Sequence, residues 1–475
     1  MGSREVIDLQ GMRVTVAGLG VSGIPAAKVL HARGAHVTVV NDGDDARARE
    51  QAAELEALGV TVRLGDGATL PEGTELVVTA PGWKPDKPLF TAARAAGVEI
   101  WGDVELAWRL RGPDAAPWLA ITGTNGKTTT TQMLASILKA AGLRTAAVGN
   151  IGVSVLDAVL GDEQYDVLAV ELSSYQLHWA PSLRAHSAAV LNLAPDHLDW
   201  HGSMEAYAAD KGRIYEGNRV ACVYNVADKA TEDLVREADV EEGCRAIGFT
   251  LGTPGPSQLG VVEGILVDRA FVEDRHKNAQ ELAEVSDVNP PAPHNVANAL
   301  AAAALARAFG VPARAVRDGL RNFTPDAHRI AHVADVDSVA YVDDSKATNT
   351  HAAEASLAAY ESIVWIAGGL AKGATFDELV VKSAKRLRGV VLIGQDRALI
   401  REALARHAPE VPVVDLDRTD TGAMSAAVRE ARGLAVAGDT VLLAPACASM
   451  DMFANYNVRG DAFAEAVRDI AGAGA

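Results

Sequence analysis

The sequence predicts an α/β protein of several domains, in which parallel sheets carry the ligand sites. Short apolar runs alternate with helix-compatible stretches along the chain, which is the pattern of strand–helix–strand units. Several of these runs end in glycine-rich or polar turns, as ligand-binding loops do at the carboxyl ends of parallel strands. With 475 residues the chain exceeds the size of one hydrophobic core, and its length indicates about three domains.

Composition and charge narrow the class of protein. Hydrophobic residues make up 49% and charged residues 22%, as in a folded globular chain. A net charge of −18 makes nucleic acid and anionic membranes poor partners. No apolar run approaches the roughly 18 residues of a membrane span, and residues 1–10 lack the apolar core of a secretory signal. The three cysteines show no CxxC spacing, so they suggest neither a disulfide framework nor a zinc site. We expect a cytoplasmic protein.

The first predicted domain, residues 1–111, has a Rossmann-like beginning. A strand is expected at 12–17, followed by the glycine turn GLGVSG, a helix at 26–33 and a strand at 37–40 that ends at Asn41-Asp42. The spacing Gly18-x-Gly20-x-x-Gly23 resembles half of a dinucleotide-binding fingerprint. NAD binding is disfavoured because a stronger phosphate loop follows later in the chain. Further strands are expected at 76–79 and 98–101, which favours a parallel sheet.

The stretch LAITGTNGKTTTT at 119–131 is the strongest functional signal. An apolar strand leads into a glycine-bracketed turn and then a helix start, the order that phosphate binding needs. Lys127 can neutralise the β/γ-phosphates and Thr128 can hold Mg²⁺. The loop departs from G-x-x-x-x-G-K-[ST], because Ile121 stands where the first glycine is expected. An ordinary glycine turn is the alternative, and nucleotide binding is favoured. The predicted nucleotide-binding positions are Gly123, Thr124, Asn125, Gly126, Lys127, Thr128 and Thr129.

The central domain, predicted at 112–326, begins with the linker GPDAAP and contains further polar groups after strands. Strands are expected at 167–171 and 188–193, an irregular loop-rich edge at 250–294, and an alanine-rich helix at 295–309. Glu171 ends a strand beside the phosphate loop, where a second Mg²⁺ ligand is favoured over a solvated glutamate. On an extended chain His197, Asp199 and His201 would share a face, so a metal site and ordinary turn chemistry both stay open. Nothing local distinguishes Lys211 from a surface lysine.

The third domain, predicted at 327–475, repeats the strand–helix alternation of a doubly wound sheet. Its expected elements are strands at 339–343, 363–367, 389–393, 411–415 and 440–444 and a helix at 423–437. Three polar strand ends, 343–349, 367–373 and 444–449, fall at one edge of this sheet and predict an anion or carboxylate site. A helix cap formed by Thr348 or Asn349 is the alternative for the first of them.

Taken together, these motifs resemble the Mur ligase family from about residue 10 to the C-terminus. The segments that carry the resemblance are GTNGKT at 123–128, ELSS at 171–174, DHLD at 196–199, His294-Asn295, His328-Arg329, DSKATN at 344–349 and ACAS at 446–449. The resemblance implies an ATP-dependent amide ligase that adds D-glutamate to UDP-N-acetylmuramoyl-L-alanine through an acyl phosphate, in peptidoglycan precursor synthesis. It implies a Rossmann-like first domain, a central P-loop-type ATPase domain with a parallel sheet and a Rossmann-like third domain, in a bacterial enzyme that is a monomer.

The resemblance also assigns roles to individual residues. Thr128 and Glu171 would ligate one Mg²⁺, and His197 would ligate a second with Lys211, which matches a lysine that CO₂ carbamylates in the family. The implied catalytic residues are Lys127, Lys211, His197 and Lys346. Those implied to hold adenosine are Asn295, Arg329 and Asp344; those implied to contact the UDP-sugar are Val21, Ser22, Asn41, Asp42 and Asn150; and those implied to hold the incoming glutamate are Lys346, Thr348, Lys372, Ser449 and Tyr456.

Two positions depart from the family pattern, and three other functions stay open. Tyr456 stands where the family usually has phenylalanine, and Asn41-Asp42 replaces the usual Asp-Thr. The alternatives are a related ligase for another amino acid or the opposite stereoisomer, a folylpolyglutamate synthase, and a non-catalytic nucleotide-dependent scaffold. The Rossmann-like first domain argues against the second, and the retained lysines and metal ligands argue against the third.

Overall fold

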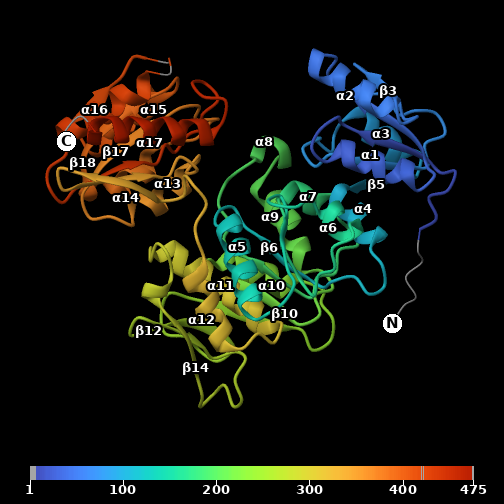
Figure 1. Cartoon of the computed structure of the whole chain (residues 1–475), viewed down its shortest axis with the longest axis horizontal. Helices are drawn as coiled ribbons and strands as arrows, with labels where there is room; N and C mark the ends of the chain where they lie inside the picture. Colours follow the sequence, from blue (N-terminus) through green and yellow to red (C-terminus); the bar gives the residue numbers. More distant parts are fainter. Residues whose placement is uncertain (1–6, 419, 421, 473–475) are drawn as a thin grey trace. The chain divides into compact units, whose positions relative to one another are not determined.

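The computed structural model describes residues 7–418, 420 and 422–472, and three sheets organise them (Figure 1). The contacts divide the chain into two compact units. The first contains the chain up to Val288 together with Asn295–Phe323, and the second contains Asn289–His294 together with the chain from Thr324 onward. Each unit is described by itself. The first holds the N-terminal and central sheets, and the second holds the C-terminal sheet.

The N-terminal sheet is parallel throughout and confirms the predicted Rossmann-like beginning. Its strands are β1 (Arg13–Ala17), β2 (His36–Asn41), β3 (Thr61–Leu64), β4 (Leu76–Thr79) and β5 (Glu99–Gly102), in the order β3-β2-β1-β4-β5. Its helices are α1 (Gly23–Ala32), α2 (Ala46–Glu56), α3 (Pro88–Ala95) and α4 (Asp103–Leu110). Among these five strands only β3 was not predicted, because this short edge strand leaves every second residue exposed.

The central sheet is mixed, with nine strands in the order β14-β13-β12-β11-β10-β9-β6-β8-β7. The strands are β6 (Trp118–Thr122), β7 (Ala147–Gly149), β8 (Leu168–Glu171), β9 (Ser187–Val190), β10 (Ala221–Asn225), β11 (Arg245–Phe249), β12 (Gln258–Val262), β13 (Ile265–Asp268) and β14 (Gln280–Glu284). The helices around it are α5 (Lys127–Ala140), α6 (Val155–Leu160), α7 (Ser174–His178), α8 (Leu198–His201), α9 (Met204–Gly212), α10 (Lys229–Glu237), α11 (Pro293–Ala308) and α12 (Ala313–Asn322).

The prediction of an irregular segment at 250–294 was wrong. This segment does form the edge of the sheet, but it contains β12, β13 and β14, which pair in antiparallel fashion. The expected parallel sheet is therefore confirmed for the strands from β7 to β12, and an antiparallel extension completes it.

The C-terminal sheet has the order β15-β16-β20-β17-β18-β19, and all of its pairs are parallel except β15–β16. Its strands are β15 (Ala331–Val336), β16 (Val339–Asp343), β17 (Ile363–Gly368), β18 (Leu387–Ile393), β19 (Val413–Asp415) and β20 (Thr440–Leu443). Its helices are α13 (Thr350–Leu357), α14 (Asp377–Ser383), α15 (Arg397–His407), α16 (Ala423–Leu434) and α17 (Tyr456–Gly472). Separate apolar clusters cover the two faces of this sheet, as a doubly wound fold requires.

Close helix packing positions the phosphate-loop helix in the central domain. Helix α12 contacts α5 closely because Gly319 has no side chain there: a Cβ at Gly319 would lie 2.4 Å from the Cα of Ile137. The Ser136 hydroxyl donates to the Gly319 carbonyl at 2.7 Å across the same contact. No helix in the described ranges is long and apolar enough to span a membrane.

Candidate active site

The phosphate loop lies where the sequence predicts it, between β6 and α5. Gly126 caps α5 in the left-handed region (φ 84°), and a Cβ on it would lie 2.4 Å from Oδ1 of Asn298. Glycine is therefore required at this position both by the backbone and by the neighbouring side chain. The Lys127 ammonium folds back over the loop and donates to the carbonyls of Gly123 and Thr124, each at 2.9 Å. The loop amides and Lys127 thus surround one end of a helix, a suitable site for phosphate oxygens.

Lys211 is buried, and the local expectation of a surface lysine was wrong. Its side chain, in a residue that is only 2% exposed, donates to Gly123 O at 2.8 Å and to Thr122 Oγ1 at 3.3 Å. Burial lowers the pKa of Lys211 well below its ordinary value, and the nearby Lys127 lowers it further. The two lysines share the Gly123 carbonyl, so a neutral Lys211 amine relieves the repulsion between them.

Glu171, at the end of β8, supplies an oxygen suited to a divalent cation. The residue is 1% exposed; Oε1 accepts from Asn150 Nδ2 at 3.1 Å, whereas Oε2 is buried and has no hydrogen-bond partner in the described part of the chain. An orphaned buried carboxylate oxygen is costly unless a cation completes it. Hard oxygen donors suit Mg²⁺, and the arrangement of Glu171 therefore fits the predicted ion.

The residues at 196–201 do not form the extended face that we considered for a metal. His197 takes a left-handed conformation (φ 54°) and begins α8, so Asp199 and His201 lie on a helical turn. The His201 side chain is buried and bonded to Asp210 and Ser174. Among the described residues, no group of three His, Cys, Asp or Glu is arranged to hold a metal. His197 stays partly exposed, and its pKa is lowered by its partial burial and by Lys127 and Lys211, against the opposing charge of Asp196.

Two neighbours of the loop were missed by sequence reasoning. The Tyr207 hydroxyl lies 2.9 Å from Thr124 Oγ1 and the residue is buried. Tyr207 precedes Lys211 by four residues on α9, so the helical spacing was the signal that could have identified it. Asn298 follows Asn295 by one turn of α11 and donates to it at 3.3 Å.

The predicted UDP-sugar residues of the first domain lie at the carboxyl ends of β1 and β2. Val21 is 89% exposed, while Asn41 Oδ1 accepts from the Leu19 amide at 3.0 Å and so holds the glycine turn. The Ser22 hydroxyl donates to Asp103 at 2.9 Å. Asp42 pairs with Lys87 at 2.5 Å, so the acidic residue after β2 is neutralised rather than free. The first-domain contacts to substrate stay a prediction.

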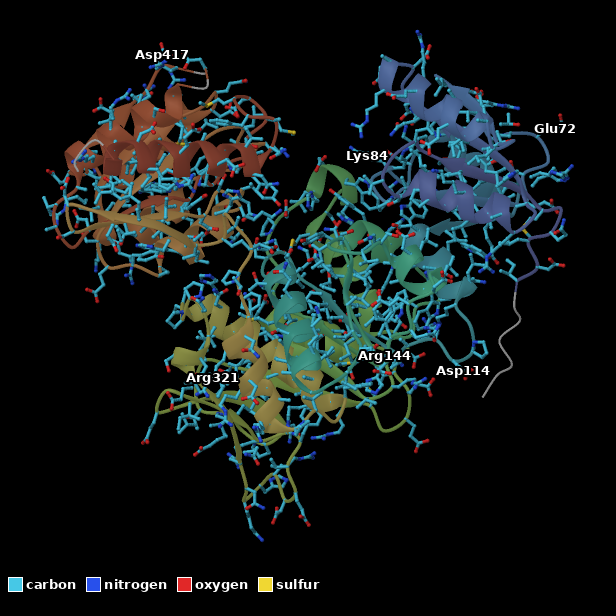
Figure 2. All side chains as sticks on the ribbon, in the orientation of Figure 1. Glu72, Lys84, Asp114, Arg144, Arg321 and Asp417 are labelled. Carbon is cyan, nitrogen blue, oxygen red and sulfur yellow. The ribbon has the colours of Figure 1, made fainter. Side chains whose placement is uncertain are left out.

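The N-terminal and central sheets are connected beside α8. Lys84, labelled in Figure 2, donates from the loop after β4 to the Asp199 carbonyl at 2.6 Å. The Trp200 indole donates to the Gly82 carbonyl at 3.2 Å. The turn that carries His197 is therefore fixed from both domains of the first unit.

In the second unit, the structure brings together three predicted strand-end loops. The Ala446 amide donates to the Ala347 carbonyl and so joins the ACAS loop to the DSKATN loop. Leu370 pairs with Ala448 through backbone hydrogen bonds and so joins the glycine-rich loop at 367–373 to the ACAS loop. The Lys346 ammonium lies 3.8 Å from the centroid of the Tyr456 ring. Four of the predicted glutamate residues, Lys346, Thr348, Lys372 and Ser449, thus come from neighbouring loops, and the fifth, Tyr456, begins α17 beside Lys346. Asn349 caps α13 and accepts from Ala352, which confirms the cap that we considered.

Asp344 and Arg459 are buried ionisable groups of this unit. Burial raises the pKa of Asp344 to about 6, against hydrogen bonding from Ser356 and the charge of Arg329. Arg459, missed by sequence reasoning, is 1% exposed, and its guanidinium bonds Ser345 and the Cys447 carbonyl at 2.9 to 3.1 Å. In the described part of the chain it forms no ion pair, and burial lowers its pKa to about 10. It ties together two loops of the predicted glutamate site.

Three α/β domains with a lysine-bearing phosphate loop and a buried second lysine define the class of nucleotide-dependent ligases. Family models for a MurD-like N-terminal domain, a Mur ligase middle domain and a Mur ligase glutamate ligase domain match residues 12–102, 121–306 and 328–447. The chain belongs to the Mur ligase family.

Its relatives are similar over nearly their whole length. The UDP-N-acetylmuramoylalanine–D-glutamate ligase of Streptomyces avermitilis is 88% identical, with 97% of this chain and 99% of that protein covered. The Streptomyces coelicolor protein of the same name is 87% identical, with 98% of this chain and 99% of that protein covered. The crystal structure of MurF ligase from Thermotoga maritima in complex with ADP has a TM-score of 0.57 at 15% identity, over 99% and 98% of the two chains. That likeness shows the fold.

Proposed function

We infer that this chain catalyses the ATP-dependent addition of D-glutamate to UDP-N-acetylmuramoyl-L-alanine, a step of peptidoglycan synthesis. The observation that carries this function is the near-full-length identity of 88% to a ligase of that name. The residues of the central domain support it, because the phosphate loop, Lys127 and the orphaned oxygen of Glu171 are the groups that phosphoryl transfer needs. ATP is a cytoplasmic substrate, so we place the enzyme in the bacterial cytoplasm, and we propose that it acts as a monomer.

The ligation proceeds in two bond-forming steps. A carboxylate oxygen of the UDP-sugar substrate attacks the γ-phosphorus of ATP. The bond between this phosphorus and the oxygen that bridges to the β-phosphate breaks, ADP departs, and the substrate becomes an acyl phosphate. The amine of D-glutamate then attacks the acyl carbon and loses a proton, and phosphate leaves as the amide forms. The first attack brings anions together, so Lys127 and the loop amides are needed to offset the repulsion. Lys346 is proposed to hold a carboxylate of the incoming glutamate.

We also propose a magnesium cofactor, with Thr128 and Glu171 at one ion and His197 with a carbamylated Lys211 at a second. The ions would neutralise charge on the phosphates during transfer. Carbamylation joins the Lys211 nitrogen to the carbon of CO₂ and releases one proton, so the amine must first be neutral. The lowered pKa of Lys211 favours that neutral form. The product is an anion beside Lys127, and the Lys127 ammonium attracts it.

Phosphate release across a panel of acceptors tests the proposed reaction. With ATP, Mg²⁺ and UDP-N-acetylmuramoyl-L-alanine, we expect release with D-glutamate and not with L-glutamate, meso-diaminopimelate or L-lysine. Lys127→Ala should abolish release, while the UDP-sugar binds with nearly unchanged affinity. Release with another acceptor would reassign the pocket of the second unit. If no acceptor gave phosphate release, the folylpolyglutamate synthase or scaffold alternatives would be favoured. Turnover by Lys127→Ala would contradict the role of Lys127 in ATP binding.

The carbamate has its own test. We expect Lys211→Ala to be inactive, because the anion beside the phosphate loop is lost, and to regain part of its activity with acetate or formate. These ions carry the carboxylate that the shortened side chain lacks. Ligation is measured as D-glutamate-dependent phosphate release, and chloride at the same ionic strength is the control. Equal activities in acetate and chloride would argue against the carbamate and leave the ligase assignment standing.

A further inference from the structure

Asp210 is a buried carboxylate with an unusual number of donors. It is 6% exposed, and His178 Nδ1 lies 2.9 Å from both of its oxygens. His201 Nδ1 lies 3.0 Å from Oδ2, and Arg213 Nε lies 3.2 Å from Oδ1. Burial opposes ionisation, but the hydrogen bonds from the two histidines outweigh it and hold the pKa of Asp210 at about 2. Because an ionised carboxylate only accepts, each histidine carries its proton on Nδ1.

The donors come from neighbouring short helices. His178 ends α7, which has five residues, and His201 ends α8, which has four. Isolated helices need roughly 12 to 15 residues to be stable, so these two depend on side-chain contacts. Asp210 connects both of them to α9. His201 Nε2 also lies 3.0 Å from Ser174 Oγ at the other end of α7, and Arg213 donates to the His178 carbonyl at 3.2 Å.

This cluster of Asp210, His178 and His201 lies directly behind the proposed catalytic groups. Lys211 follows Asp210 on α9 and reaches Gly123 O, and Tyr207 reaches Thr124 from the same helix. Tyr207 and Lys211 share one face of the helix, whereas Asp210 is turned about 100° away from Lys211, toward α7 and α8. His197 begins the helix that His201 ends. Of the groups in the cluster, none bonds to the phosphate loop in the described structure, so an effect on catalysis must pass through His197 or through Lys211 and Tyr207 of α9.

We propose that Asp210 is a positioning residue: with His178 and His201 it holds Lys211 in register with the phosphate loop. The inference rests on the proposed ligase function and goes beyond it, because the cluster provides none of the groups that the reaction uses directly. Asparagine at this position keeps the shape but replaces one acceptor oxygen with an amide donor, which faces a second N–H. The α7–α9 contact then loosens. Since a misplacement of about 1 Å at a reacting centre can cost about 100-fold in rate, a small shift of α9 is enough to be measured.

A double-mutant cycle tests this role. Phosphate release is measured for the full-length wild type, Asp210→Asn, Lys211→Ala and the double variant, with the two Lys211→Ala proteins assayed in acetate. Rates are expressed per ADP-binding site, so that misfolded protein does not count. We expect Asp210→Asn to lower kcat by about tenfold or more, with KM values for the three substrates changed by less than about threefold. In Lys211→Ala, Asp210→Asn should lower kcat by less than about threefold, because the free acetate that replaces the carbamate is not held by α9.

The chain offers a matched control. Asp377 also accepts from a histidine and an arginine, His407 at 2.7 Å and Arg406 at 2.7 to 2.9 Å, but it is on α14 in the second unit. Asp377→Asn should keep wild-type kcat. The proposal would be overturned if Asp210→Asn lowered kcat by the same factor in the wild type and in Lys211→Ala. It would also be overturned if a loss of ADP-binding sites accounted for the whole fall in kcat. If acetate does not rescue Lys211→Ala, the proposal is judged on Asp210→Asn alone, by whether its kcat per ADP-binding site falls while its KM values stay nearly unchanged. A wild type without D-glutamate-dependent release would instead refute the proposed function.

Discussion

Three of the predicted ligand residues are buried ionisable side chains, Glu171, Lys211 and Asp344, and the buried Arg459 bonds two loops of the predicted glutamate site. A charge without a counter-ion costs free energy in a protein interior, so such groups mark functional sites more often than structural ones. The loop carbonyls that Lys211 and Arg459 bond reduce this cost without removing it. The bound phosphates, Mg²⁺ and glutamate carboxylates of the proposed reaction would supply the missing counter-charges.

Asp344 allows this cost to be measured as a pH dependence. Its pKa is about 6 in the folded protein, against 3.8 as the ordinary value. The folded state therefore binds more protons than the unfolded state between these values, and stability falls as pH rises through about 4 to 6, by about 3 kcal/mol at most. Asp344→Asn mimics the protonated group. We expect its melting temperature to exceed that of the wild type at pH 7.5 and to differ little at pH 4, as measured by calorimetry.

The exposed Asp335 of the same unit is the control for this measurement, since its side chain is 67% exposed and its one ion pair among the described residues is with His332. Asp335→Asn should leave the melting temperature within about 1 °C at both pH values, because exposed pairs contribute little. A wild type that is as stable as Asp344→Asn at pH 7.5 would show that the carboxylate is not penalised.

At the scale of elements, the strands and helices that could be predicted are those whose pattern lies within a few consecutive residues. The run into β6, the glycine turn and α5 are consecutive, so the phosphate loop could be located to the residue. The hairpin β12–β13, and the strand β15 that pairs with the predicted β16 in a second hairpin, could not be predicted. Their two-residue turns, Glu263-Gly264 and Asp337-Ser338, have positive φ at both positions, as a type I′ turn requires. Glutamate and serine are not typical of that conformation, so the usual Asn-Gly signal is missing.

The same distinction explains which site residues were found. Strand-end residues such as Glu171 and Lys346 are predictable because parallel strands bring their carboxyl ends to one edge. Arg459 acts on Ser345, which is 114 positions away in the sequence, and Asp210 acts on His178 across 32. No periodicity or motif connects such pairs. Lys211 was identified only through its family resemblance, because its burial depends on the packing of α9 against the phosphate loop.

At the scale of the whole molecule, the chain forms two compact units, and the predicted ligand residues divide between them. The phosphate loop, Glu171 and Lys211 belong to the first unit, and Asp344 and Lys346 belong to the second. One apolar cluster runs through both sheets of the first unit, from Val14 to Trp118 and beyond, whereas the second has clusters of its own. Proteins with separate cores do not unfold as one two-state system.

We therefore expect two calorimetric transitions, each of which responds to a different change. The UDP-sugar substrate contacts residues of the first unit alone in the proposed function, so UDP-N-acetylmuramoyl-L-alanine should raise the transition of that unit, by an amount that grows with the logarithm of its concentration. Asp344→Asn should move only the other transition at pH 7.5, because the groups that perturb Asp344, among them Ser356 and Arg329, all belong to the second unit. A single transition that moves as a whole in both experiments would mean that the units unfold together, and the independence inferred from their separate cores would be wrong.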